Sequence, residues 1–195
     1  MRPLGQDAAL LVVDMQTGFD DPVWGARNNP AAEANVAVLL GAWRAFSRPV
    51  IHVHHDSAEP ASVLRRGAPG NGPKPEALPL EGERVYRKRV NNAFLGTDLE
   101  AGLRALRVRR LAIVGLTTNH CVSTTARMAG NLGFDTFVLA DATAAFARAH
   151  VDGRLRPAEE VHDAALSDLQ GEFARVVDTR AVLSALARSK EAARA

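Results

Sequence analysis

The sequence has little of several features that mark particular classes of protein. Its 195 residues include a single cysteine, so the chain can form neither an internal disulfide nor a dithiol redox couple of its own. No apolar run approaches the roughly 18 residues that a membrane-spanning helix needs, and a basic segment followed by an apolar one is missing at the N-terminus. We therefore expect a cytoplasmic protein with no membrane partner.

An excess of one charge is also missing. The 24 Lys and Arg residues against 22 Asp and Glu leave a formal net charge of only +2. The pI of about 9.1 reflects the scarcity of groups that titrate between neutral pH and pH 9. Arginines cluster at residues 107–110, but they precede an apolar strand, where a solvated loop explains them better than a nucleic-acid surface. We expect no nucleic-acid partner.

The most informative segment is the one that contains the only cysteine. Residues 111–114 form a branched apolar run typical of a buried strand, which stops at Gly115, and a helical pattern begins near Cys121. Thr118 or Asn119 can cap that helix, so the thiol would lie near unpaired backbone N–H groups that favour thiolate over thiol. A lone cysteine is otherwise a small buried apolar residue. Its position at the carboxyl end of a strand, where open α/β sheets bind ligands, favours a nucleophile.

Strands and helices alternate along the whole chain. The expected strands are Ala8 to Val13, Val50 to His54, Arg84 to Lys88, Leu111 to Val114, Thr136 to Ala140 and Ala174 to Val177. The expected helices are Pro30 to Phe46, Thr97 to Leu106, one from about Cys121, Pro157 to Leu169 and Thr179 to Ala187. This order predicts one domain over residues 1–195, with an α/β fold of three layers, α/β/α, in which helices cover both faces of a mostly parallel sheet. The charged tail, residues 188–195, is expected to fray.

Two loops attract attention because of their composition. The segment after the first strand, residues 15–30, is rich in turn formers and carries Phe19 and Trp24, which can line a pocket. The segment 56–82 shows no periodicity and many prolines and glycines. A loop of this length is usually functional, so we expect a lid, a rim or a contact with another subunit.

Three side chains can meet at one edge of such a sheet. The carboxyl ends of parallel strands share an edge, so Asp14, Lys88 and Cys121 can converge although they are distant in the sequence. The aspartate could accept the thiol proton, the lysine could stabilise the thiolate, and backbone amides of the turn could stabilise an oxyanion. Taken alone, Asp14 would be interpreted as an aspartate that satisfies loop amides, and Lys88 as a solvent-facing lysine.

The sequence also resembles a known superfamily in three segments. VVDMQTGF, RKRVNNAFLGTDL and VGLTTNHCVSTTARMAGNLGF are similar to the signature segments of the isochorismatase-like cysteine hydrolases, in the same order. The resemblance spans nearly the whole chain. It implies that Asp14, Lys88 and Cys121 are the catalytic residues, with Cys121 as the nucleophile.

The resemblance implies further features of fold and site. These are a six-stranded parallel sheet, a cis peptide between Leu116 and Thr117, and an oxyanion hole built with Thr117 and Cys121. Relatives often carry a serine where this chain has Asn92, which we expect to contact substrate together with Phe19 and Trp24. Relatives also associate, so we expect a homodimer or a homotetramer.

A histidine-rich strand raises the possibility of a metal site. His52 and His54 lie on one side of the strand that Asp56 follows, and His55 lies on the other. Nicotinamidases, within the same superfamily, carry a metal near this strand, but their pattern has further histidines in the next loop. Residues 57–82 contain none, so we expect no metal and no cofactor. His120 is expected to support or pack against the site, because its side chain diverges from that of its neighbour Cys121.

Three functions stay open at this point. The first is hydrolysis of a small amide, in which Cys121 attacks the carbonyl carbon and water cleaves the resulting thioester. The second is hydrolysis of the vinyl ether of isochorismate, which uses an acidic residue and no thiol. The third is a non-enzymatic or redox role for an activated thiol. The cysteine at the turn favours the first, but nothing in the sequence identifies the amide.

Overall fold

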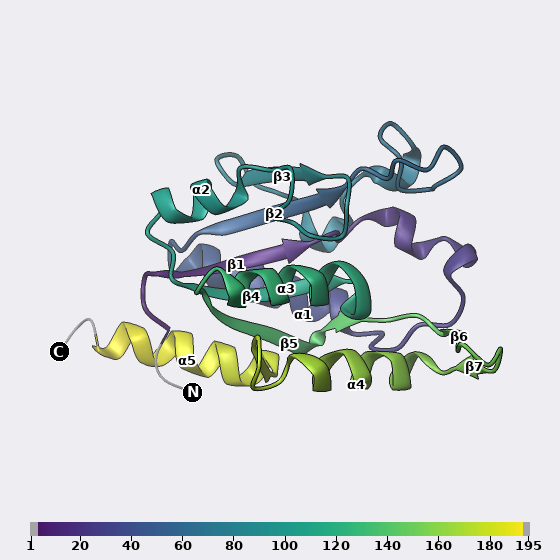
Figure 1. The fold of residues 1–195 in the computed structure, drawn as a ribbon. Coiled ribbons are helices and arrows are strands. Elements are labelled where there is room, and N and C mark those ends of the chain that lie inside the picture. Colours follow the sequence, from purple (N-terminus) through teal and green to yellow (C-terminus); the bar gives the residue numbers. More distant parts are fainter. Residues whose placement is uncertain (1–3, 193–195) are drawn as a thin grey trace.

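A parallel six-stranded sheet forms the centre of the protein (Figure 1), which is described here for residues 4–192 of a computed structural model. The strand order is β3-β2-β1-β4-β5-β8, and every neighbouring pair is parallel. Helices lie on both faces of the sheet. The expected fold class is therefore confirmed, including the number of strands.

The elements follow one another as the alternating pattern predicts. The sheet contains β1 (Ala8–Val13), β2 (Val50–His55), β3 (Arg84–Lys88), β4 (Arg110–Leu116), β5 (Asp135–Ala144) and β8 (Arg175–Val177). The helices are α1 (Ala32–Ala45), α2 (Leu99–Ala105), α3 (Ser123–Asn131), α4 (Ala158–Leu169) and α5 (Thr179–Ala192). Short 3₁₀ helices cover Thr17–Asp20, Pro22–Trp24, Pro69–Asn71 and Pro75–Ala77, and a π-helical turn covers Thr118–Val122. A small antiparallel pair, β6 (Arg148–Ala149) and β7 (Leu155–Arg156), was not expected.

Strand β1 is continuously apolar because both of its faces are buried. Leu10 and Val12 belong to the core beneath α1 and α5, which also contains Trp43. Leu11 and Val13 point to the opposite core, beneath α2, α3 and α4. A central parallel strand is covered on both sides, so an apolar residue at every position is favourable there.

The described structure extends several elements beyond their expected ends, most clearly α5 and β5. Helix α5 does not end at Ala187 but runs to Ala192, and in the added part the Ser189 hydroxyl accepts a hydrogen bond from Arg48. Residues 193–195 of the tail lie outside the described residues. Strand β5 continues past Asp141, whose Oδ1 accepts hydrogen bonds from the backbone N–H and the hydroxyl of Thr179, both at 2.9 Å.

Gly115 marks the point where β4 leaves its regular path toward the cysteine. Its φ is +118°, and a Cβ atom added there would lie 1.9 Å from the carbonyl oxygen of Val13. The register with β5 also shifts between Ile113 and Gly115. Only glycine can occupy this position without displacing β1, so the residue allows β4 to approach β1 closely just before the turn.

The long segment 56–82 is tied to the sheet by amide side chains. Asn71 Nδ2 donates to the carbonyl oxygens of His55 and Leu64 at 2.9 and 2.8 Å. Gln16 Nε2 donates to the carbonyl oxygens of His55 and Asn71 at 3.0 and 2.9 Å. These bonds join the first part of the segment to the carboxyl ends of β1 and β2, so residues 56–74 form a rim beside that edge of the sheet, and residues 75–82 lead back to the amino end of β3.

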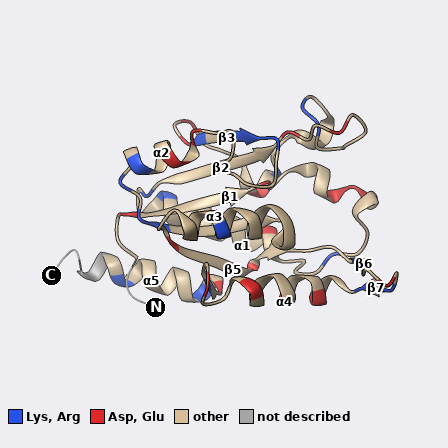
Figure 2. Cartoon of the chain, viewed as in Figure 1, with Lys and Arg blue, Asp and Glu red and all other residues tan. Residues whose placement is uncertain are grey.

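Positive and negative residues are mixed over the described part of the protein, and neither sign dominates a large region. Figure 2 shows basic and acidic residues interspersed over the helices and loops, in keeping with a net charge of +2. Among residues 4–192, no helix combines the length and the apolar character needed to cross a bilayer.

Candidate active site

Three of the predicted site residues meet at the carboxyl edge of the sheet. Asp14 directly follows β1, Lys88 is the last residue of β3, and Cys121 lies in the π-helical turn after β4. Lys88 Nζ donates to Asp14 Oδ2 at 2.6 Å and to Cys121 Sγ at 3.2 Å. The structure therefore brings together the three side chains that the sequence suggested.

Lys88 is held in one position by three acceptors. Its third partner is His55 Nδ1 at 3.1 Å, so all three ammonium protons have an acceptor. The side chains of Lys88 and Asp14 are fully buried. A lysine is almost never fully buried unless it is paired. A solvent-facing lysine and an ordinary loop aspartate are thus both ruled out as interpretations of these residues.

Burial controls the protonation of the site more than the lysine does. Burial raises the pKa of Asp14, although Lys88 acts in the opposite direction. Burial and the negative charge of Asp14 raise the pKa of the Cys121 thiol to about 12, again against the effect of Lys88. Lys88 lowers the pKa of the thiol as expected, but burial and Asp14 outweigh it, so the expectation of a resting thiolate is not met. The cysteine rests as a thiol because it is buried beside a carboxylate.

Asp14 is placed to receive the thiol proton. Its Oδ1 is buried and has no hydrogen-bond partner among the described residues. A carboxylate oxygen of Asp14, a ring nitrogen of His55 and Cys121 Sγ all lie within 4.8 Å of one another. A carboxylate with a raised pKa is a stronger base than an ordinary aspartate, so it can deprotonate the thiol as the thiol attacks.

The turn that carries the cysteine differs from a capped helix start. The peptide between Leu116 and Thr117 is cis, as the resemblance implied. Neither Thr118 nor Asn119 caps a helix with its side chain, and Thr118 Oγ1 instead lies 2.8 Å from His162 Nδ1 of α4. The Thr117 carbonyl accepts from the backbone N–H groups of His120 and Val122, each at 3.2 Å. The oxyanion role of Thr117 and Cys121 stays a prediction.

Two residues of the site were missed by sequence reasoning. Asn91 Oδ1 lies 3.6 Å from Cys121 Sγ and can accept the thiol hydrogen bond. Nothing in the sequence distinguishes Asn91 from the predicted Asn92, whose Oδ1 is engaged by the Phe94 backbone N–H at 2.9 Å. His55 could have been found, since it pairs in register with Lys88 and points away from the other strand histidines.

Two of the three candidate metal ligands, His52 and Asp56, have other partners. His52 Nε2 lies 2.9 Å from a Glu83 carboxylate oxygen, and Asp56 forms a bidentate pair with Arg87. Within residues 4–192, the only three residues close enough to share a metal are Asp14, His55 and Cys121. The ammonium group of Lys88 contacts all three of them, so a metal cation there would meet a fixed positive charge. This donor set does not suit a metal.

A small pocket lies beside the cysteine turn. Its volume is about 230 Å³, and it is lined by Val23, Trp24, Thr117, Asn119, His120, Phe146, Ala147 and Arg148. The rings of Phe19, Trp24 and Phe146 pack together, with centroids 5.0 to 6.2 Å apart. Trp24 therefore lines the pocket as predicted, whereas Phe19 does not line it and supports the other two rings.

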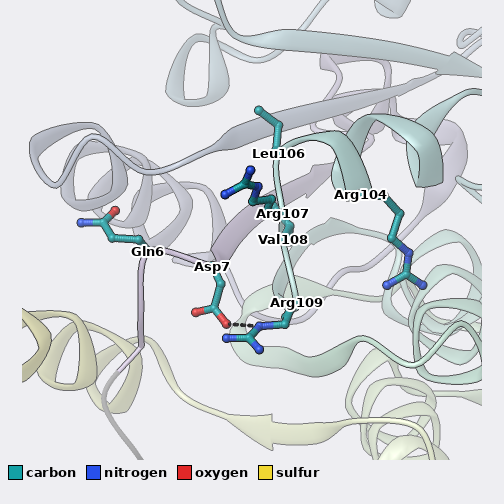
Figure 3. Close-up of a pocket in the computed structure, with 7 residues that line it drawn as sticks. All are labelled: Gln6, Asp7, Arg104, Leu106, Arg107, Val108 and Arg109. Atoms are coloured by element: carbon teal, nitrogen blue, oxygen red, sulfur yellow. Dashed lines mark hydrogen bonds and ion pairs between the residues drawn. The ribbon is translucent and has the colours of Figure 1, made fainter.

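A larger cavity lies at the opposite edge of the sheet. It has a volume of about 630 Å³ and is lined by Gln6, Asp7, Arg104, Leu106, Arg107, Val108 and Arg109 (Figure 3). Asp7 precedes β1 and Arg109 precedes β4, so this cavity borders the amino ends of the strands. It is far from the thiol and contains no nucleophile, so the smaller pocket is the better candidate for binding substrate.

Comparison with known proteins identifies the family. The family model of the isochorismatase domain matches residues 8–181. The chain belongs to the isochorismatase family. YrdC of Bacillus subtilis (strain 168), an uncharacterized member, is 42% identical over 171 residues, which cover 88% of this chain and 91% of the relative. Nicotinamidase 3 of Arabidopsis thaliana is 31% identical, with 90% of this chain and 87% of that protein covered.

Solved structures of the isochorismatase family share the fold closely. An isochorismatase-family protein from Chromobacterium violaceum ATCC 12472 superimposes with a TM-score of 0.92 at 46% identity. The match covers 96% of this chain and 99% of the other. This isochorismatase-family chain is accordingly a hydrolase by its family, and its substrate has to be argued from the site.

Proposed function

We propose that this isochorismatase-family hydrolase cleaves the C–N bond of a small amide through a thioester on Cys121. The observation that carries the proposal is the buried cluster in which Lys88 Nζ lies 2.6 Å from Asp14 and 3.2 Å from Cys121. Such a cluster holds a nucleophile, a base and a cation within reach of one reacting carbon. A relative that is named a nicotinamidase supports an amide as substrate.

The reaction begins with proton transfer from the Cys121 thiol to Asp14. The sulfur attacks the carbonyl carbon at the same time, because a thiol with a pKa of about 12 is not ionised beforehand. Negative charge develops on the carbonyl oxygen, where the backbone N–H groups of Thr117 and Cys121 would stabilise it. The ammonium group of Lys88, which contacts Asp14 and Cys121, offsets the negative charge as that charge moves between carboxylate, sulfur and oxygen.

The second half of the reaction returns the enzyme to its resting state. The C–N bond breaks as the protonated Asp14 gives its proton to the leaving nitrogen, which forms the amine or ammonia. A water molecule then loses a proton to Asp14 and attacks the thioester carbon. The carboxylic acid product leaves, and the sulfur regains a proton.

The two alternative functions either leave a residue of the site without a role or need a group that the chain does not have. Hydrolysis of a vinyl ether would use Asp14 as an acid and would give Cys121 no chemical role. A redox role would need a second thiol from another molecule, since the chain has one cysteine. The buried contact between Lys88 and the sulfur therefore favours amide hydrolysis.

The test uses a panel of primary amides together with isochorismate. Purified protein should hydrolyse at least one amide, and iodoacetamide should abolish that activity. Rapid acid quenching followed by mass spectrometry should show an acyl group on the peptide that contains Cys121. Hydrolysis of isochorismate that survives alkylation, with no amide turned over, would overturn the proposal. The expected cytoplasmic location stays a prediction.

A further inference from the structure

The pocket beside the cysteine turn has one aromatic side and one charged side. Trp24 and Phe146 form the aromatic side, with ring centroids 5.7 Å apart. Arg148, from β6, contributes the charge. Such a pairing of a flat apolar surface with a single cation suits a ligand that has an apolar body and an anionic end.

Arg148 lacks the acidic partner that nearby arginines have. Arg127 pairs with Asp168 at 3.5 Å, and Arg156 pairs with Glu160 at 3.8 Å. Among the described residues, no carboxylate lies within 4.0 Å of Arg148, and its guanidinium instead donates to His120 Nε2. This acceptor is neutral, because burial and the charge of Arg148 lower the pKa of His120. The charge of Arg148 is therefore not balanced by another residue.

The pocket connects this charge to the reacting atoms. Thr117, which we expect to help form the oxyanion hole, lines the same pocket as Arg148. His120, the hydrogen-bond partner of Arg148, directly precedes Cys121 in the chain. A ligand whose carbonyl group lies at Thr117 can therefore extend along the aromatic side toward Arg148.

We propose that the amide substrate carries a carboxylate that pairs with Arg148, while its short apolar spacer packs on Trp24 and Phe146. A guanidinium forms two parallel hydrogen bonds with a carboxylate, which orients the ligand as well as binding it. The pocket volume of about 230 Å³ is below the ~300 Å³ typical of sites for drug-sized ligands, so the substrate is a small amic acid. This assignment rests on the proposed amide hydrolysis.

The first test does not depend on hydrolysis. Iodoacetate and iodoacetamide both transfer their methylene carbon to the thiol with loss of iodide, and they differ in one charged group. Cys121 is the only cysteine, so alkylation reports this site alone. We expect Arg148→Gln to lower the ratio of the iodoacetate rate to the iodoacetamide rate about tenfold, because it removes a charge-assisted hydrogen bond near the thiol. Lys88 also attracts iodoacetate, but it does so equally in the wild type and in Arg148→Gln, so it does not change the comparison between them.

A matched control separates Arg148 from general charge effects. Arg107→Gln makes the same change at the opposite edge of the sheet (Figure 3), and it should leave the ratio as in the wild type. Arg148→Lys keeps the positive charge, so its ratio should lie between that of the wild type and that of Arg148→Gln. Equal ratios in the wild type and Arg148→Gln would overturn the anion subsite.

The second test measures hydrolysis of succinamate and succinamide, which differ in whether the far end carries a charge. The wild type should prefer succinamate, and Arg148→Gln should raise the KM for succinamate about tenfold with little change for succinamide. A fall in the alkylation ratio without hydrolysis of either amide would support the anion subsite and count against amide hydrolysis. If both amides are hydrolysed with equal KM values, and Arg148→Gln changes neither value, the proposed amide hydrolysis is supported. The proposal that the substrate carries a carboxylate is then rejected.

Discussion

The two edges of the parallel sheet both carry cationic side chains, but they hold them in different ways. At the carboxyl edge, Lys88 is fully buried and donates to three acceptors. At the amino edge, Arg107 and Arg109 are exposed, and Arg109 pairs with Asp7 at 3.0 Å (Figure 3). The larger cavity is at the amino edge, yet Asp14 and Cys121, whose pKa values are raised by burial, are at the other. Burial with fixed partners, more than cavity size, therefore marks the edge where chemistry is expected.

The sharpest test of this comparison removes the nucleophile. Cys121→Ala should lower amide turnover at least about a thousandfold, because no other residue of the site can form the thioester. The folded state should survive, since alanine keeps a small apolar group in a site that is 7% exposed. Activity assays and thermal unfolding check both expectations. Unchanged turnover in the purified variant would reject covalent catalysis by Cys121.

Removal of the buried cation should be the most damaging change to stability. Lys88→Met leaves the Asp14 carboxylate buried without its partner, which costs about 3 to 5 kcal/mol of unfolding free energy. It should also raise the pKa of Cys121 above its value of about 12, so alkylation by iodoacetamide should be slower at pH 9. Urea unfolding and the pH profile of alkylation measure the two effects.

The corresponding change at the amino edge is the control for Lys88→Met. Arg107 is exposed, so Arg107→Met should alter the unfolding free energy by no more than about 0.5 kcal/mol. Its alkylation profile should match that of the wild type. If both variants behave alike, the two edges do not differ as described and Lys88 is not the partner of the thiol.

A buried histidine on β2 gives the carboxyl half of the sheet a sensitivity to acid. Burial, together with the charge of Arg87, lowers the pKa of His54 from 6.5 to about 4, and its buried Nδ1 has no hydrogen-bond partner within residues 4–192. The folded state therefore holds the neutral form, while the unfolded chain takes up a proton below pH 6.5. Stability from this residue is complete above that pH and is lost as the pH falls toward 4.

The measurement compares the wild type with His54→Leu, which cannot titrate. Between pH 7 and pH 4, the wild type should lose about 3 kcal/mol more unfolding free energy than the variant does. Denaturant titrations at both pH values provide the numbers. Parallel losses in the two proteins would show that His54 does not control this pH dependence.

Association with a second copy should distinguish the long segment from the amino-edge cavity as a surface. Leu80, in the long segment just before β3, is 53% exposed, and Leu106, at the amino-edge cavity, is 39% exposed. We expect a homodimer or homotetramer that covers the long segment, so Leu80→Glu should weaken association and Leu106→Glu should not. Sedimentation at micromolar concentration measures this. A wild-type species of only 20.9 kDa would contradict the prediction.

The smallest expected effect is that of chelation. Lys88 occupies the position where Asp14, His55 and Cys121 would share a metal, so exhaustive chelation should leave amide hydrolysis unchanged. Elemental analysis should find no stoichiometric metal. Activity that is lost with a chelator and restored by zinc, iron or manganese would show that the carboxyl edge depends on a metal after all.

The sequence was sufficient to predict the features that depend on local sequence patterns. The apolar run of β1 and its alternation with helices predicted the layers, because a strand that is buried on both faces has no polar positions. The three segments around Asp14, Lys88 and Cys121 pointed to one edge, because parallel strands end together. The cis peptide before Thr117 was expected only through the resemblance.

Features that depend on distant contacts came only from the tertiary structure. Asp14 and Lys88 are 74 positions apart, and the degree of their burial decides that Cys121 rests as a thiol. The charge of Arg148 matters because its neighbours in space include no acid within 4.0 Å among the described residues, which no local pattern could reveal. The sequence alone determined which chemical groups are present and on which elements they lie. Their protonation and the shape of the pocket were decided by packing, because desolvation and electrostatic interaction depend on neighbours in space rather than along the chain.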